Sequence, residues 1–168
     1  TSGTIDIAVH ICGIEPLIIA AIERPVFVKK LLDSLHQLDV FRLELLLETG
    51  VCDVIERSGW SESSSYWSPS IYRDLIFDHV KQLVTMTHKE GLKFRYNIHT
   101  GIMPMIPILL ELDIDILGGV DPVQGGADMA QLKTDCGHRF CFIGGLNSYI
   151  TLGQGDRKTI RTAVKEAI

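Results

Sequence analysis

Apolar residues recur along the chain at two different spacings. From Pro25 to Gly50 they return every three or four residues, which is the spacing of one face of an amphipathic helix. A proline at the first helical position and a glycine just beyond the last are usual helix ends. The sequence therefore predicts a helix over residues 25–49. The same spacing predicts further helices at residues 69–90, 105–112, 129–132 and 157–168.

Short apolar runs lie between these helices and end in glycine, histidine or aspartate. They predict buried strands at residues 51–55, 93–98, 114–117 and 140–143. Near the start of the chain, every second residue from Ile5 to Ile11 is isoleucine or valine. A period of two is typical of a strand, so residues 4–12 are also predicted as a strand.

Alternation of strand and helix predicts an α/β fold with a parallel sheet and right-handed crossovers. A doubly wound sheet and a (β/α)8 TIM-type barrel both fit this alternation. A complete barrel takes about 250 residues, so a chain of 168 residues supplies about five to six of the eight βα units. No composition shift marks a boundary, and we expect a single domain over residues 1–168.

Composition narrows the class of protein. The chain is 46% hydrophobic and 22% charged, as in an ordinary globular domain. Its net charge of −5 is the wrong sign for a nucleic-acid binder. The longest apolar runs, such as residues 17–22, are too short to cross a membrane. Four cysteines without a CxxC pair, and no secretory segment at the start, indicate reduced thiols in a cytoplasmic protein.

Candidate chemistry lies at the predicted strand ends, where parallel α/β folds place their sites. His99 follows the strand at 93–98, and a neutral imidazole there can bind a metal or move a proton. Asp121 follows the strand at 114–117 and can fix a substrate group or a cation. Each has a plainer interpretation: His99 as a cap or a partner of a loop carbonyl, and Asp121 as a turn residue before Pro122.

Two further segments have the composition of a ligand site. Gly144 and Gly145, with Asn147 close behind, can point backbone N–H groups at an anion. A tight strand-to-helix turn explains the same glycines equally well. Trp60 belongs to a polar loop with three aromatic residues, which can line a pocket for a flat organic ligand or be simply solvated.

Taken together, these segments resemble the uroporphyrinogen decarboxylase superfamily, which includes the corrinoid-dependent methylcobamide:coenzyme M methyltransferases. The matching pieces, in order, are residues 13–15, 23–25, 50–54, 68–72, 89–91 leading to His99, 113–121, Gly125 with Asp128, Lys133 with Gly137, and 144–147. The resemblance covers nearly the whole chain as the middle and late part of a longer barrel, in keeping with a first residue that is not Met. It implies a loop entering a helix near residues 4–12, against the strand predicted above.

The methyltransferase branch implies methyl transfer between a corrinoid or methylated donor and a small acceptor. In that branch a His-x-Cys-Gly motif binds zinc; here His99 matches the histidine, but Thr100 and Gly101 follow and the cysteine is absent. The resemblance leaves His99 as the remaining metal ligand. From the resemblance together with their strand-end positions, we expect His99 and Asp121 to be the catalytic residues. Trp60 and the segment 144–147 would contact the substrate.

Two alternatives remain open. Decarboxylation of a porphyrinogen needs cations to hold its carboxylates, and the pattern after the late strand reads Gly-Gly-Leu-Asn-Ser instead of the decarboxylase Gly-Asn-Leu-Asp-Pro. A barrel that binds a corrinoid or another tetrapyrrole without catalysis is the alternative of a different class. Expected partners are a small-molecule or tetrapyrrole substrate, a corrinoid protein and further copies of the chain.

Overall fold

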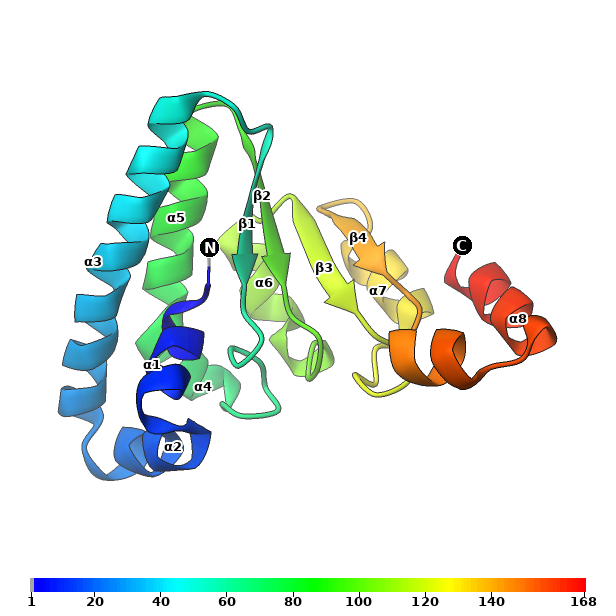
Figure 1. Cartoon of the computed structure of the whole chain (residues 1–168), viewed down its shortest axis with the longest axis horizontal. Helices are drawn as coiled ribbons and strands as arrows, with labels where there is room; N and C mark the ends of the chain where they lie inside the picture. Colours follow the sequence, from blue (N-terminus) through cyan, green and yellow to red (C-terminus); the bar gives the residue numbers. More distant parts are fainter. Residues whose placement is uncertain (1) are drawn as a thin grey trace.

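Four parallel strands form the centre of the structure, a computed structural model that describes residues 2–168 (Figure 1). Their order in the sheet is their order in the chain: β1 (Val54–Ser58), β2 (Lys93–Asn97), β3 (Ile116–Val120) and β4 (Cys141–Gly144). The predicted α/β class with a parallel sheet is confirmed. A doubly wound sheet reverses its strand order near the middle, whereas this sheet does not reverse.

Helices precede the sheet, connect its strands and follow the last of them. They are α1 (Thr4–Cys12), α2 (Ile14–Glu23), α3 (Pro25–Thr49), α4 (Pro69–Tyr72), α5 (Asp78–Lys89), α6 (Ile106–Leu112), α7 (Met129–Cys136) and α8 (Arg157–Ala167), with π-helical turns η1 (Arg73–Phe77) and η3 (Ser148–Gln154) and a 3₁₀ turn η2 (Met103–Met105). In Figure 1 α6 and α7 lie behind the sheet, while α1 and α2 lie near the carboxyl end of β1. The other face of the sheet is open towards the viewer.

Side chains alternate between these two faces. Register pairs such as Ile55 with Phe94 are buried under the helices. The intervening pair, Glu56 and Arg95, lies on the open face and forms an ion pair of 3.1 Å. The open face therefore carries polar groups, on the side that a closed barrel would make its interior.

Several helix ends lie where the sequence predicts them. Helix α3 begins at Pro25, and Gly50 after its last residue has the left-handed conformation of a C-terminal cap. Ser68 accepts a hydrogen bond from the Ile71 N–H at the start of α4. Asp156 does the same for Thr159 at the start of α8. Each satisfies an N–H that the helix itself leaves unpaired.

The strand predicted at residues 4–12 is wrong, because this segment is helix α1. Ile5 and Ala8 are fully buried beside α3, whereas Ile11 is 64% exposed. Ile7 and Val9, which continue the alternation, are only partly buried, so packing of a helical face against α3 overrides the β-branched pattern. Residues 2–168 accordingly contain four strands, fewer than the five to six βα units expected.

Two predicted strands begin too early. Strand β1 starts at Val54 and not at Val51, which is 77% exposed, and it continues through the charged residues Glu56 and Arg57. Strand β3 starts at Ile116 and not at Ile114, and it extends through two glycines to Val120. An apolar run is therefore a poor guide to the ends of strands that carry charged side chains or glycines.

A fully buried guanidinium ties α1 and α3 to β1. Arg57 donates to Glu62 at 2.7 and 3.2 Å, to Asp39 of α3 at 3.1 Å and to Thr4 of α1 at 3.1 Å. Tyr96 of β2 donates to the same Glu62 carboxylate at 2.6 Å. Burial alone would lower the pKa of Arg57, but the carboxylates of Glu62 and Asp39 raise it above its ordinary value. The group therefore stays charged, and its partners stay fixed.

No single helix among residues 2–168 is long and apolar enough to cross a membrane. Helices α1 and α2 pass that test only as a pair, and the chain bends by 106° between them.

Removing the Arg57 charge should strongly destabilise the fold. Arg57→Met leaves two buried carboxylates without their cation, and breaking a buried pair in this way costs about 3–5 kcal/mol. The measurement is the free energy of unfolding in urea, and loss of any cooperative transition counts as the same result. Arg73→Met is the matched control, because the Arg73–Glu111 pair is solvent-exposed and should change stability little. Equal, small losses in both variants would contradict this account.

Candidate functional site

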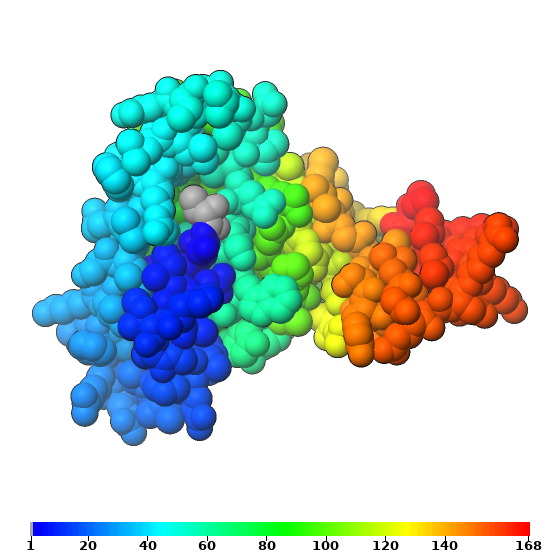
Figure 2. All heavy atoms as spheres, viewed as in Figure 1, coloured from blue at the N-terminus to red at the C-terminus, as the bar shows by residue number. Residues whose placement is uncertain are grey.

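The loops after the four strands bring several predicted residues to one rim of the sheet. Trp60 follows β1, His99 follows β2, Asp121 follows β3 and Asn147 follows β4. The Trp60 and His99 rings are in contact, with centroids 4.5 Å apart and planes tilted by 46°. Figure 2 shows this side of the molecule, with the bulk of α1–α3 at one end and η3–α8 projecting at the other.

Helix α1 holds Trp60 in place through Asp6. The Asp6 carboxylate accepts hydrogen bonds from the backbone N–H groups of Trp60, at 3.2 Å, and Ser61, at 2.8 Å. Asp6 is buried and lies in the first turn of α1. The negative charge of Asp6 also acts on His99. A helix that the sequence led us to expect as a strand therefore contributes a carboxylate to the rim.

Asp121 and Asn147 form a second part of the rim. The Asn147 amide donates to Asp121 at 2.6 Å and to Gln124 at 2.9 Å. Asp121 also accepts from the backbone N–H groups of Val123 and Gln124, as a turn residue does. The plainer interpretation of Asp121 as a turn residue is thus confirmed, while its role at the site stays a prediction. These four hydrogen bonds hold the side chains of Asp121 and Asn147 against each other.

His99 is half-buried and should be neutral near pH 7. Burial lowers the pKa of its imidazole, as does the positive charge of Arg95. The carboxylates of Asp121 and Asp6 act in the opposite direction, and the pKa nevertheless lies below its ordinary value. A neutral imidazole with a carboxylate nearby can accept a proton and be stabilised once it carries one.

Two consecutive glycines of β3 leave room for this arrangement. A methyl group at Gly119, whose φ is +76°, would lie 2.8 Å from the His99 ring. One at Gly118 would overlap the Asn97 amide and lie 2.7 Å from Nε of Arg95. Arg95 donates to Asn97 at 2.9 Å, so both side chains lie across β3 on the open face. Small residues in β3 therefore let the side chains of β2 occupy the rim.

The second pair of glycines does not form the predicted anion cradle. The Gly145 N–H donates to the Val120 carbonyl at 2.7 Å and is not available to an anion. A methyl group at Gly145 would meet Ala167 of α8, and one at Gly144 would meet the Val120 backbone. The tight-turn interpretation describes these glycines. Beside them lies a cavity of about 440 Å³ between the loop after β3, the loop after β4 and α8.

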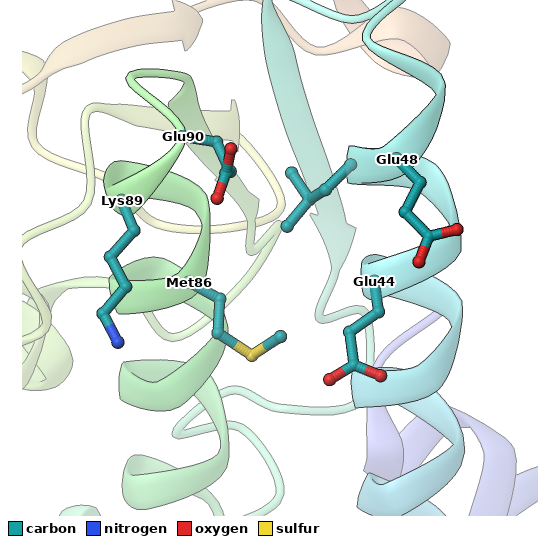
Figure 3. Close-up of a pocket in the computed structure, with 6 residues that line it drawn as sticks. Glu44, Glu48, Met86, Lys89 and Glu90 are labelled. Carbon is teal, nitrogen blue, oxygen red and sulfur yellow. The ribbon is translucent and has the colours of Figure 1, made fainter.

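A different groove, of about 460 Å³, lies far from this rim (Figure 3). It lies between the carboxyl-terminal ends of α3 and α5, with Glu44, Glu48 and Glu90 among its lining residues. Since β2 begins three residues after Glu90, this groove belongs to the amino-terminal end of the sheet. It is not part of the candidate site.

The side chains around His99 do not fit the zinc site that the resemblance implies. His99 packs against an indole and is followed by Thr100 and Gly101. Thr100 instead hydrogen-bonds to Ser63 and Ser65 of the preceding loop. Residues 2–168 contain no group of three or more histidine, cysteine, aspartate or glutamate side chains placed to bind a metal.

Sequence reasoning missed three residues of this rim: Asp6, Arg95 and Asn97. Asp6 was hidden by the wrong strand at residues 4–12. The other two carry a usable signal, since a charged and an amide residue alternate with Phe94 and Tyr96 within one strand. That alternation places them together on the face away from the buried aromatic residues.

Comparisons with known proteins bear on the fold. No protein-family model and no curated protein sequence matches the chain. Among solved structures, a methyltransferase from Methanosarcina mazei matches with a TM-score of 0.81 and 18% sequence identity, over 99% of this chain. The two proteins share a fold. The match spans only 47% of the methyltransferase chain, so the present chain corresponds to about half of that protein.

Substituting Gly119 should separate His99 from Trp60. In Gly119→Ala the new methyl group displaces the imidazole, and the positive φ adds strain of about 1 kcal/mol. The measurement is the nuclear Overhauser effect between the two rings, which we expect to disappear. Gly126→Ala is the control: φ there is +65°, but nothing lies within 4 Å of the added methyl group. The Gly126→Ala variant should lose a similar amount of stability and keep the contact between the His99 and Trp60 rings. An unchanged contact between these rings in Gly119→Ala would contradict the site geometry.

Proposed function

We propose that the chain belongs to an enzyme of the uroporphyrinogen decarboxylase superfamily that transfers a methyl group from a corrinoid or another methylated donor to a small acceptor. The reaction would take place at the rim formed by Trp60, His99 and Asp121. The observation that carries the proposal is the contact of a neutral imidazole with an exposed indole, at strand ends where parallel α/β folds place their sites. The fold shared with a methyltransferase supports it, and so does the resemblance of sequence segments described above. On this proposal the sheet is part of a (β/α)8 barrel.

His99 acts as the general base on this proposal. It takes the proton from the acceptor while the acceptor atom attacks the methyl carbon. The bond between the methyl carbon and the donor breaks, and its electron pair stays on the donor. The carboxylate of Asp121 stabilises the imidazolium that results. Trp60 forms one wall of the site and keeps water away from one side of the imidazole.

Decarboxylation of a porphyrinogen is less well supported. Several carboxylates need several cations, and neither Arg57 nor Arg139 is placed to supply one at this rim. Arg57 is fully buried in its network, and Arg139 pairs with Asp113 just before β4 begins, at the amino-terminal end of the sheet. Arg95 reaches the open face but is paired with Glu56. Among residues 2–168, these three arginines therefore do not form an array of free cations for a polyanion at this rim.

Replacement of His99 tests the proposal. Methylcobalamin and tetramethylammonium serve in turn as donors and 2-mercaptoethanol as the acceptor, with the methyl thioether measured by mass spectrometry. His99→Ala should lower the rate by about 100- to 10,000-fold, which is the usual contribution of a general base. His138→Ala is the control, since His138 is exposed in the turn before β4.

Product formation at the full rate in His99→Ala would contradict the role of the imidazole. No product with either donor from the unaltered chain would contradict methyl transfer. Binding of methylcobalamin without turnover would favour the non-catalytic, corrinoid-binding alternative.

A further inference from the structure

Trp60 is an exposed aromatic side chain that is nevertheless held in place. It is 59% exposed although its ring contacts His99 and its backbone is fixed by Asp6. Trp67, in the same loop, is 1% exposed and donates its indole N–H to the Ser61 carbonyl. The loop therefore buries one indole and presents the other. A fixed indole with a free face is a surface for a flat or a cationic ligand.

The charges around this indole favour a cation. The charged groups that act on His99 are the carboxylates of Asp121 and Asp6 and the guanidinium of Arg95. Arg95 is already neutralised by Glu56 at 3.1 Å. The imidazole itself is neutral, and the nearby Gly145 N–H is taken by a carbonyl. The rim thus has an excess of negative charge and no backbone cradle for an anion at that glycine.

Hydrogen bonding at the rim favours a particular kind of cation. Asp6 accepts two backbone N–H groups, and Asp121 accepts two more together with the Asn147 amide. Of the roughly four acceptor positions of a carboxylate, Asp6 thus uses two and Asp121 three. A cation that donates no hydrogen bonds loses none in such a site, whereas a primary ammonium exchanges water acceptors for carboxylate oxygens that already accept other hydrogen bonds.

We propose that the rim binds a fully methylated ammonium group, held over the free face of Trp60 and attracted by Asp121 and Asp6. Attraction between a quaternary ammonium and an indole face is a well-established mode of recognition. This inference rests on the proposed function, because it identifies the class of the methylated donor. In the reaction the C–N bond breaks and its electron pair stays on nitrogen, which leaves as a neutral amine. The acceptor gains the methyl group and gives its proton to His99.

Titration of the 168-residue chain with tetramethylammonium chloride, at constant ionic strength, tests this inference. The indole N–H signals of Trp60 and Trp67 report separately in one ¹⁵N-correlated NMR spectrum, so Trp67 is an internal control. We expect the Trp60 signal to shift saturably and the Trp67 signal to stay unmoved. Choline should act as tetramethylammonium does. Its neutral isostere 3,3-dimethylbutan-1-ol and ammonium chloride should have little effect.

Trp60→Leu should weaken tetramethylammonium binding, measured by calorimetry, by about 2- to 30-fold, the range expected for loss of a cation–π contact. A Trp67 signal at the same position as in the unaltered chain shows that this variant is folded. As a separate single variant, Asp121→Asn should also weaken tetramethylammonium binding, and the remaining binding should depend less on salt concentration. An unmoved Trp60 signal, or an equal shift with the neutral isostere, would overturn the inference.

These outcomes are distinguishable from failure of the proposed function. Saturable binding of tetramethylammonium without any methyl thioether product would support the ligand class and contradict methyl transfer. Product formed from methylcobalamin without binding of tetramethylammonium would support methyl transfer and contradict the cationic donor.

Discussion

A guanidinium removed from water is stable only where carboxylates surround it, and that requirement determines how this chain packs around β1. Arg57 lies in the strand, and its partners come from α1, from α3 and from the loop that follows β1. Satisfying one charge therefore fixes two helices that are distant from β1 in sequence, together with the loop that follows the strand. The same arrangement places Asp6 on α1 beneath the backbone of Trp60. The buried network thus determines the position of an exposed aromatic side chain at the rim.

The rim places carboxylates beside an imidazole that is partly removed from water. Its carboxylates accept hydrogen bonds from backbone and amide donors, two at Asp6 and three at Asp121. His99 is partly removed from water, which keeps its imidazole neutral beside them. Because Gly118 and Gly119 have no side chains, the polar side chains of β2 and the loop after it fit over β3. Such a site disfavours anions and favours a ligand that brings positive charge without hydrogen-bond donors.

Local signals in the sequence predict the helix ends well, because Pro25, Ser68 and Asp156 act through neighbouring backbone groups. Local sequence signals fail where contacts with residues distant in sequence determine the structure. Burial of Arg57 depends on Asp39 and Glu62, so no local pattern places that residue in a strand. The segment 4–12 alternates like a strand but packs against α3 as a helix. His99, Trp60 and Asp121 could be selected as strand-end residues, whereas Asp6 required the fold, and the Gly145 cradle failed because Val120 takes its N–H.

The central claim is that His99 and Asp121 face one shared rim, and the proton affinity of His99 tests it most directly. The measurement is the pKa of the His99 imidazole by NMR titration in the unaltered chain, in Asp121→Asn and in Arg95→Gln. Loss of the Asp121 carboxylate should lower that pKa, and loss of the Arg95 charge should raise it. Asp128→Asn, which keeps an N-cap on α7, should leave it unchanged. A His99 pKa that is the same in all four proteins would show that these groups do not share a site.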